Sequence, residues 1–132
     1  MSVFVDTSAF LSFLNALDRD HTAAQATWVE LIQQDETLIT TSYILVETFA
    51  LVQRRLGLEA IRDFERDVVP ILLTHWITAA EHSIGVAALI AENRRQLSLV
   101  DCTSFQIMRQ LGIGTVFAFD QHFAEQHFVC IP

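Results

Sequence analysis

The sequence predicts an α/β fold with a mainly parallel central sheet of about five strands, flanked by helices. Two observations support this fold class. Segments with apolar residues at helical spacing alternate along the chain with short apolar runs of strand length. The runs are apolar throughout and do not alternate with polar residues, which is typical of strands buried on both faces. Such strands joined by helices form βαβ units, and these units produce parallel pairing.

Five apolar runs are the expected strands, and six helices are expected between them. The first run is "SVFV", which leads directly into Asp6. Gly57, Pro70 and Gly112 end the third, fourth and sixth helices, because glycine and proline interrupt helical geometry. The expected strands cover residues 2–5, 37–40, 71–76, 115–119 and 128–131, and the helices lie around residues 10–17, 24–32, 45–56, 61–68, 84–91 and 98–111.

Length and composition favour one soluble domain spanning residues 1–132. Hydrophobic residues make up 52% of the chain and charged residues 18%, which argues against disordered and fibrous proteins. No apolar run approaches the roughly 20 residues of a membrane helix. The start of the chain has no basic segment of the kind that begins a secretory signal. We therefore expect a cytoplasmic protein with no membrane segment.

The charged residues exclude several enzyme classes. Net charge is −8, from 16 acidic and 8 basic residues, and every basic residue is arginine. P-loop proteins, haloacid-dehalogenase phosphatases and receiver domains all require a lysine, which this chain lacks. The negative net charge of an acidic protein does not attract nucleic acid at long range. If nucleic acid is the substrate, something must therefore neutralise the negative charge of the site that binds it.

Cys102 and Cys130 fit no metal-binding pattern, and we expect two buried free thiols rather than a zinc site.

Four acidic residues occupy related places in the predicted elements. Asp6 and Asp120 each follow an apolar strand directly. Glu47 lies in the helix after the second strand, and Asp101 lies in the first turn of the sixth helix. In a parallel sheet, the carboxyl ends of the strands and the starts of the following helices meet at one edge. All four carboxylates can therefore converge there.

Each acid also has a structural explanation, and the group has a chemical one. Asp6 and Asp120 are residues typical of helix N-caps, Asp101 follows Ser98 at capping-box spacing, and Glu47 could face solvent. Converging carboxylates, however, repel one another and cannot all stay ionised unless a cation joins them. Oxygen ligands of this kind suit Mg²⁺ or Mn²⁺, and two such ions can promote phosphodiester hydrolysis. The group therefore predicts metal-assisted cleavage of a phosphodiester.

Four segments resemble the motifs of PIN-domain ribonucleases, most closely the VapC-type toxins of bacterial toxin–antitoxin pairs. They are "VFVDTSAFLSFLN", "ITTSYILVETFALVQRR", "LSLVDCTSFQIMRQLGI" and "VFAFDQHF", and the resemblance covers essentially the whole chain. It implies a three-layer α/β/α fold with a parallel sheet between helices. It also implies a catalytic site for Mg²⁺ or Mn²⁺, supported by the hydroxyl of Ser8 and formed by Asp6, Glu47, Asp101 and Asp120. The first three would be the nearer ligands, and Asp120 would act through water or a second ion.

The activity that this resemblance implies is endonucleolytic hydrolysis of single-stranded RNA, leaving 5′-phosphate and 3′-hydroxyl ends. It also implies homodimers, and inhibition by an antitoxin whose tail enters the acidic groove. Three alternatives stay open at this point. They are a PIN-like binding module without catalysis, a PIN nuclease outside any toxin–antitoxin pair, and a metal-dependent DNA nuclease. The acidic balance motivates the first, because many family members carry a more basic surface.

Clustered arginines and one histidine are candidate contacts for RNA. Arg62 and Arg66 are set apart from them, because acidic neighbours at helical spacing favour surface ion pairs there. The ten phenylalanines lie mainly on predicted core faces, so we expect them to pack rather than to stack on bases. The candidate RNA contacts are Arg54, Arg55, Arg94, Arg95 and His122.

The third and fifth predicted helices favour a dimer interface. The segments "SYILVETFALV" and "HSIGVAALIAE" carry apolar residues on more than one face. The mean hydropathy of the chain is +0.36. A helix that is apolar nearly all round is buried on both sides, whereas the sheet of one subunit covers only one side. We therefore expect a two-fold homodimer formed largely by these two helices.

Overall fold

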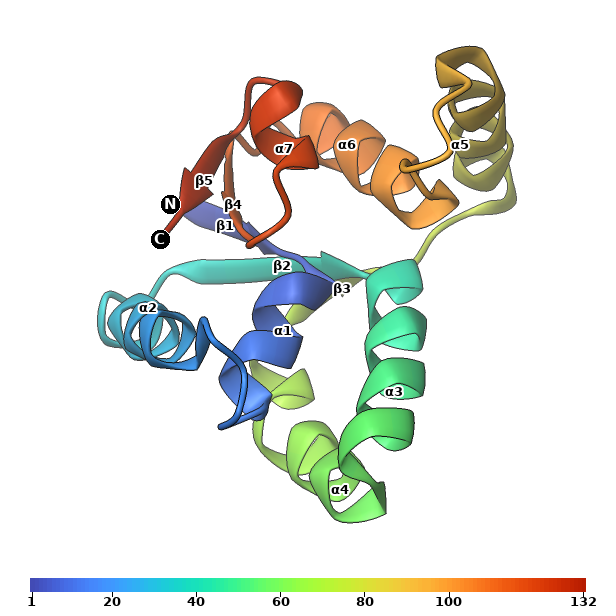
Figure 1. Ribbon diagram of the computed structural model, residues 1–132. Coiled ribbons are helices and arrows are strands. Elements are labelled where there is room, and N and C mark those ends of the chain that lie inside the picture. The colour runs from blue at the N-terminus through green and yellow to red at the C-terminus, as the bar shows by residue number, and fades with distance from the viewer.

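A single parallel sheet of five strands forms the centre of the molecule (Figure 1). The computed structural model describes residues 1–132. The strands lie in the order β3-β2-β1-β4-β5, and every neighbouring pair is parallel, which confirms the predicted fold class. Their bounds are Ser2–Val5 for β1, Thr37–Thr41 for β2, Leu73–His75 for β3, Thr115–Phe117 for β4 and Val129–Ile131 for β5.

Helices cover both faces of this sheet, as the predicted three-layer arrangement requires. Figure 1 shows α1 to α4 on one side, with α6 and α7 on the other and α5 packed outside against α6. A short 3₁₀ helix, Val69–Ile71, follows α4. The α-helices are Thr7–Leu14 (α1), His21–Gln33 (α2), Ser42–Leu56 (α3), Leu58–Asp67 (α4), Ala79–Glu92 (α5), Leu99–Leu111 (α6) and His122–Glu125 (α7).

The central position of β1 explains why its sequence shows no alternation of polar and apolar residues. Val3, Phe4 and Val5 are all fully buried, because helices cover the strand on both faces. Phenylalanines fill much of the core, as predicted. Phe10 meets Phe64 edge to face with ring centroids 5.3 Å apart. No helix of the structure is both long and apolar enough to cross a membrane.

The structure differs from the sequence-based boundaries at the margins of the sheet. The third strand begins at Leu73 rather than at residue 71, because Pro70 and Ile71 belong to the 3₁₀ helix Val69–Ile71. It is an edge strand, which leaves Leu73 60% exposed. The helix α7 was not predicted, since four residues are too few to show a period. Both cysteines are free, but Cys130 is only partly buried, in contrast to the expectation of two buried thiols.

Side-chain caps place three helix starts at the carboxyl edge of the sheet. Asp6 caps α1 directly after β1, and Thr41 caps α3 directly after β2 through a bond from the Ile44 amide. Ser98 caps α6. Residues immediately inside these caps therefore lie close to the ends of β1, β2 and β4.

Candidate active site

Asp6 is the most deeply buried of the four predicted acids. It lies at the end of β1 with 5% of its surface exposed, and its backbone amide donates to the carbonyl of Phe117 on β4. Its Oδ2 accepts two hydrogen bonds from Ser8, one from the amide at 3.1 Å and one from the hydroxyl at 2.7 Å. Asp6 is therefore the N-cap of α1, which is the structural role that its position in the sequence suggested. It is also part of the acidic group.

The environment of Asp6 opposes its ionisation. Burial raises the pKa of Asp6 to about 6, with further increases from the negative charges of Asp101 and Asp120. The hydrogen bonds from Ser8 act in the opposite direction, because they stabilise the carboxylate. Without a cation, this site holds a carboxyl group that is partly protonated near neutral pH.

Glu47 lies on α3 and faces the other acids rather than only solvent. Its pKa is raised by burial first, then by the charges of Asp101 and Asp120, while the Thr7 hydroxyl lowers it. The hydroxyl of Thr48, on the next position of α3, donates to Thr7 Oγ1 at 3.1 Å. This contact joins α3 to α1, and it holds the helix that carries Glu47 against the helix that Asp6 caps.

Asp101 combines a capping role with a place in the acidic group. Its Oδ2 accepts from the Ser98 amide, and the Ser98 hydroxyl accepts from the Asp101 amide, both at 3.0 Å. Burial and the charge of Asp120 raise the pKa of Asp101, against the lowering effects of Ser98 and His122. The capping box uses one carboxylate oxygen, so the other is available to a ligand.

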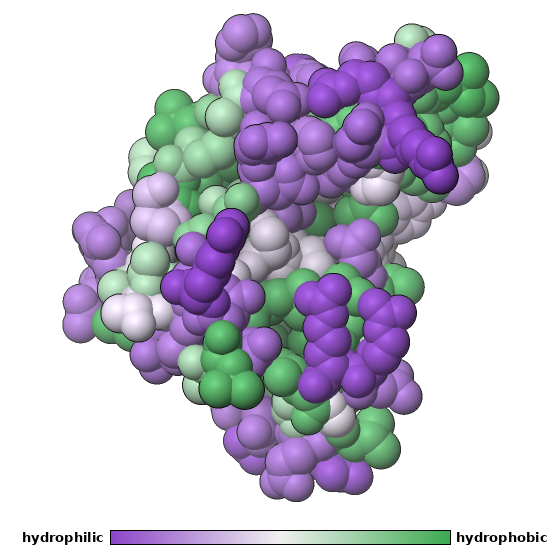
Figure 2. All heavy atoms as spheres, viewed as in Figure 1, coloured by the Kyte–Doolittle hydropathy of each residue, from purple (hydrophilic) through white to green (hydrophobic).

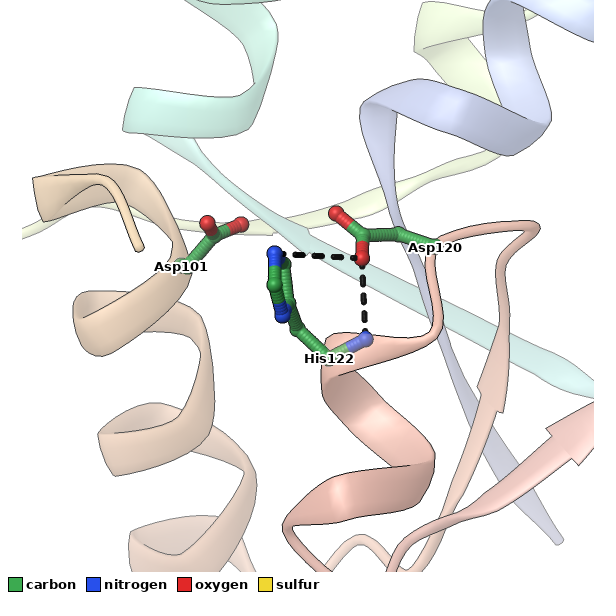
Figure 3. A group of neighbouring side chains, drawn as sticks. All are labelled: Asp101, Asp120 and His122. Carbon is green, nitrogen blue, oxygen red and sulfur yellow. Dashed lines mark hydrogen bonds and ion pairs between the residues drawn. The ribbon is translucent and has the colours of Figure 1, made fainter. Parts of the chain in front are cut away.

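Asp120 and His122 complete the group from the segment after β4. Figure 3 shows the imidazole of His122 between the carboxylates of Asp101 and Asp120. One ligand atom from each of these three residues lies within 4.8 Å of the other two. Asp120 Oδ1 accepts from the His122 amide at 2.9 Å and lies 3.8 Å from His122 Nε2. The sequence placed His122 among RNA contacts, whereas in the structure it stands inside the acidic group.

Glu125 is a residue of this region that sequence reasoning missed. Its Oε2 lies 3.4 Å from His122 Nδ1 and 3.1 Å from Arg94 Nη1. The available signal was the spacing of Glu125 three residues after His122, which puts both on one face of a helical turn. Arg94 is thus held in an ion pair at the border of the site.

The other predicted RNA contacts lie outside the acidic group. Arg54 and Arg55 are exposed on the last turn of α3, Arg95 is exposed after α5, and none of the three forms an ion pair. Of the two arginines predicted to form surface ion pairs, Arg66 pairs with Asp63 and Asp67, whereas Arg62 forms none. Figure 2 shows a hollow between the part of the molecule formed by α5, α6 and α7 and the part formed by α1, α3 and α4. Hydrophilic side chains lie along its sides.

The donor set fits a divalent cation. Burial raises the pKa values of Asp6, Glu47 and Asp101, and the charge of another acid of the group raises each of them further. No arginine forms an ion pair with any of the four acids, and Arg94 pairs with Glu125. Carboxylate oxygens are ligands that both Mg²⁺ and Mn²⁺ prefer, and an imidazole nitrogen is a ligand that Mn²⁺ accepts. A cation bound here would reduce the repulsion among these carboxylates.

The protein-family model of the PIN domain matches residues 3–129. The chain belongs to the PIN-domain family. This PIN domain is 31% identical over 128 residues to the 23S rRNA-specific endonuclease VapC20 of Mycobacterium tuberculosis, an alignment that covers 96% of this chain and 95% of the relative. The resemblance to VapC-type proteins predicted from the four motifs is confirmed.

Solved structures agree with this assignment. The crystal structure of Mycobacterium tuberculosis VapC20, described as a sarcin–ricin loop cleaving toxin, superposes with a TM-score of 0.83 at 31% identity, covering 96% of each chain. FitAcB from Neisseria gonorrhoeae superposes with a TM-score of 0.68 at 15% identity, covering 100% of this PIN domain and 97% of that chain. The second likeness concerns the fold alone.

Proposed function

We propose that this PIN domain is an endoribonuclease that requires Mg²⁺ or Mn²⁺ and hydrolyses RNA phosphodiesters to 5′-phosphate and 3′-hydroxyl ends. One observation carries the proposal. Four carboxylates, from the residue after β1, from α3, from α6 and from the segment after β4, lie at one edge of the sheet, and none of them forms an ion pair with an arginine. The similarity to a relative described as a 23S rRNA-specific endonuclease supports RNA as the substrate class.

The acidic residues would share the binding of the cation. Asp6, Glu47 and Asp101 would hold it directly, and Asp120 would act through water or a second ion. When bound, divalent ions stabilise the charge of the phosphate and make an attacking water more acidic. Ser8 would keep the Asp6 carboxylate oriented and ionised, since it donates two hydrogen bonds to Oδ2.

RNA cleavage by the purified protein tests this proposal. We expect cutting of an RNA hairpin that carries a sarcin–ricin-type loop in the presence of Mg²⁺ or Mn²⁺, and none with EDTA. Asp6→Asn should abolish cutting while the fold is retained, because the amide cannot replace an anionic ligand. Asp35→Asn is the matched control, since Asp35 is exposed and precedes β2, whereas the acidic group lies at the carboxyl ends of the strands. Its positive φ of 54° is one that asparagine tolerates.

Several outcomes would contradict the proposal. Cutting that survives EDTA would exclude the metal mechanism, and equal cutting of DNA of matched sequence would exclude specificity for RNA. A protein without activity and without a rise in melting temperature on adding Mn²⁺ would be a binding module. The products report the chemistry, because only ends with a 5′-phosphate are shortened by a 5′-phosphate-dependent exonuclease.

We also propose that the protein is the toxin of a toxin–antitoxin pair and acts in the cytoplasm, where its RNA substrate lies. The acidic edge of the sheet would attract a basic segment of an antitoxin. The test is expression with and without the product of a small neighbouring reading frame. Growth arrest that the neighbour relieves is the expected result. Growth that is unaffected by wild-type protein with demonstrated ribonuclease activity would place this nuclease outside such a pair.

A homodimer is the assembly that we propose from the exposed apolar residues. Val46 on α3 is 69% exposed, and Ile90 on α5 is 72% exposed. Trp76, which lies between β3 and α5, is also 72% exposed. An apolar hollow of about 380 Å³ lies beside Val46 and Trp76, and its other lining residues are Ser42, Leu45, Phe49, Glu65 and Val69. Figure 2 shows hydrophobic atoms over α5 at the edge of the molecule.

Light scattering at micromolar concentration tests the dimer. We expect about twice the chain mass of 14.9 kDa for the wild type. Ile90→Glu should give the monomer, because a charge in a desolvated interface has no partner. A wild-type mass near that of one chain would exclude the dimer at this concentration.

A further inference from the structure

We propose that His122 is a metal ligand, and that its Nε2 forms a mixed nitrogen and oxygen subsite with Asp101 and Asp120. The inference deepens the proposed metal-dependent nuclease and rests on it. Ligand atoms of these three residues lie within 4.8 Å of one another, so one ion can touch all of them. Figure 3 shows the imidazole between the two carboxylates, with one ring nitrogen directed at Asp120.

The two ring nitrogens of His122 face different partners. Nε2 is the nitrogen directed at Asp120, at 3.8 Å from Oδ1, a distance too long for a direct hydrogen bond. Nδ1 faces the carboxylate of Glu125 at 3.4 Å. A histidine that binds a metal commonly donates its other N–H to a carboxylate, which sets the tautomer and leaves a lone pair for the ion. Glu125 has this relation to His122.

Glu125 is itself held in place and ionised. Arg94 Nη1 lies 3.1 Å from the same oxygen that faces His122. The hydrogen bond from Arg94, and next that from His122, keep the pKa of Glu125 below its usual value. Arg94 therefore contacts Glu125, and Glu125 contacts Nδ1 of the His122 imidazole. The other ring nitrogen, Nε2, faces the acids.

The position of the imidazole is also fixed by the backbone. His122 is the first residue of α7, its amide donates to Asp120 Oδ1 at 2.9 Å, and its side chain is only 13% exposed. The next residue, Phe123, is fully buried and anchors the short helix in the core. The imidazole is thus presented to the acidic group by a rigid segment rather than by a free loop.

The subsite has a consequence for metal choice. Imidazole nitrogen suits transition metals, whereas Mg²⁺ prefers oxygen ligands alone. Asp6 and Glu47 offer oxygen only, so the site would have an all-oxygen side and a side that contains nitrogen. We therefore expect the side formed by Asp101, Asp120 and His122 to bind Mn²⁺ more tightly than Mg²⁺.

Pulsed electron paramagnetic resonance of the full chain loaded with Mn²⁺ tests the inference, because ¹⁴N modulation reports an imidazole bound directly to the ion. Spectra are recorded at one and at two equivalents of Mn²⁺, so that the subsite is filled whichever ion binds first. We expect ¹⁴N modulation in the wild type and its loss in His122→Gln, with Mn²⁺ affinity lowered by more than about 10-fold. Glu125→Gln should keep the modulation and lower Mn²⁺ affinity by about 10-fold. The matched control is His127→Asn, an exposed histidine of positive φ, which should leave the spectrum unchanged.

The outcomes separate this inference from the proposed function. A wild type that binds Mn²⁺ and cuts RNA without ¹⁴N modulation would overturn the ligand role of His122 and leave the nuclease standing. Modulation that persists in folded His122→Gln would also overturn it. Modulation that depends on His122, in a protein that cuts no RNA, would support the subsite and contradict the proposed function. Absence of Mn²⁺ binding would overturn the subsite, and absence of cutting with both Mg²⁺ and Mn²⁺ would overturn the proposed function as well.

Discussion

The hydroxyl of Ser8 lies 2.7 Å from Asp6 Oδ2 and donates a hydrogen bond to it. The same hydroxyl accepts from the backbone amide of Phe119 at 3.0 Å. Ser8 therefore connects the residue at the end of β1 with the segment after β4, which carries Asp120. One small side chain sets the orientation of Asp6 and the separation of two of the four candidate ligands.

Ser8→Ala is predicted to impair the site without unfolding the protein. Loss of the donor raises the pKa of Asp6 further and frees the Phe119 amide, so we expect Mn²⁺ affinity and the cleavage rate to fall by about 10-fold. Calorimetric titration with Mn²⁺ and single-turnover cleavage measure the two effects. Ser83→Ala is the control, because Ser83 is exposed on α5 and its side chain makes no hydrogen bond to another residue. Equal affinities for the two variants would contradict this role of Ser8.

The stability of the metal-free protein is predicted to fall as pH rises. The pKa of Asp6 is about 6 in the folded state against 3.8 in the unfolded chain, so the folded state binds more protons between these values. Folding is therefore favoured at acid pH, and up to about 3 kcal/mol of unfolding free energy is lost as pH increases through 6. The raised pKa values of Glu47 and Asp101 act in the same direction.

Urea unfolding in EDTA at about pH 4.5 and about pH 7.5 measures this pH dependence. Asp6→Asn should show a smaller loss of stability over the same range and exceed the wild type at the higher pH. Addition of Mn²⁺ should reverse the loss in the wild type, because the cation stabilises the carboxylates. A wild type that becomes more stable with pH in EDTA would show that Asp6 does not titrate as stated.

Arg54 and Arg55 are predicted to contact RNA phosphates through charge alone. Arg54 lies two helical turns after Glu47 on α3, so it shares a face with that acid at about 10 Å along the helix. Replacing both arginines by glutamine should weaken RNA binding at low salt and reduce the slope of log affinity against log salt by about 0.7 per arginine. Fluorescence anisotropy over a salt series gives this slope.

Arg66→Gln is the matched control for these variants. Its charge is already neutralised by Asp63 and Asp67, so the salt slope should stay at the wild-type value. The same slope for the double variant and the wild type would exclude Arg54 and Arg55 from the RNA interface.

Gly85 is predicted to be required for the close crossing of α5 and α6. A Cβ atom at this position would lie 2.7 Å from Thr103 Oγ1, and Thr103 is fully buried. Gly85→Ala gains about 1 kcal/mol of helix propensity but loses about 1 to 3 kcal/mol through overpacking, so we expect net destabilisation. Since α6 carries Asp101, Mn²⁺ affinity should fall as well.

A double-mutant cycle with Thr103→Ala separates the two contributions. Thr103 Oγ1 has no hydrogen-bond partner, so its removal breaks no bond and opens space at the crossing. In the Thr103→Ala background, Gly85→Ala should stabilise the protein by up to about 1 kcal/mol, as helix propensity alone remains. Thermal unfolding of the four proteins measures this coupling, and additive effects would contradict the steric explanation.

Features that depend on neighbouring residues could be predicted from local sequence patterns. Apolar period and glycine or proline stops predicted the strands and six of the helices, because a regular element repeats its pattern every few residues. The places of Asp6 and Asp120 followed from the same reasoning, since Asp6 comes directly after β1 and Asp120 lies three residues after the end of β4. The capping box of Ser98 and Asp101 is likewise local, and both of its hydrogen bonds are present.

Contacts between residues far apart in the chain depend on how whole elements pack. Arg94 and Glu125 are 31 positions apart and pair because the loop after α5 comes close to α7. His122 lies among the acids because Phe123 anchors α7 in the core, and a helix of four residues leaves no period in the sequence. The crossing at Gly85 depends on the depth of Thr103 in another helix. Contacts of this kind arise from the packing of whole elements, and short-range patterns carry no record of them.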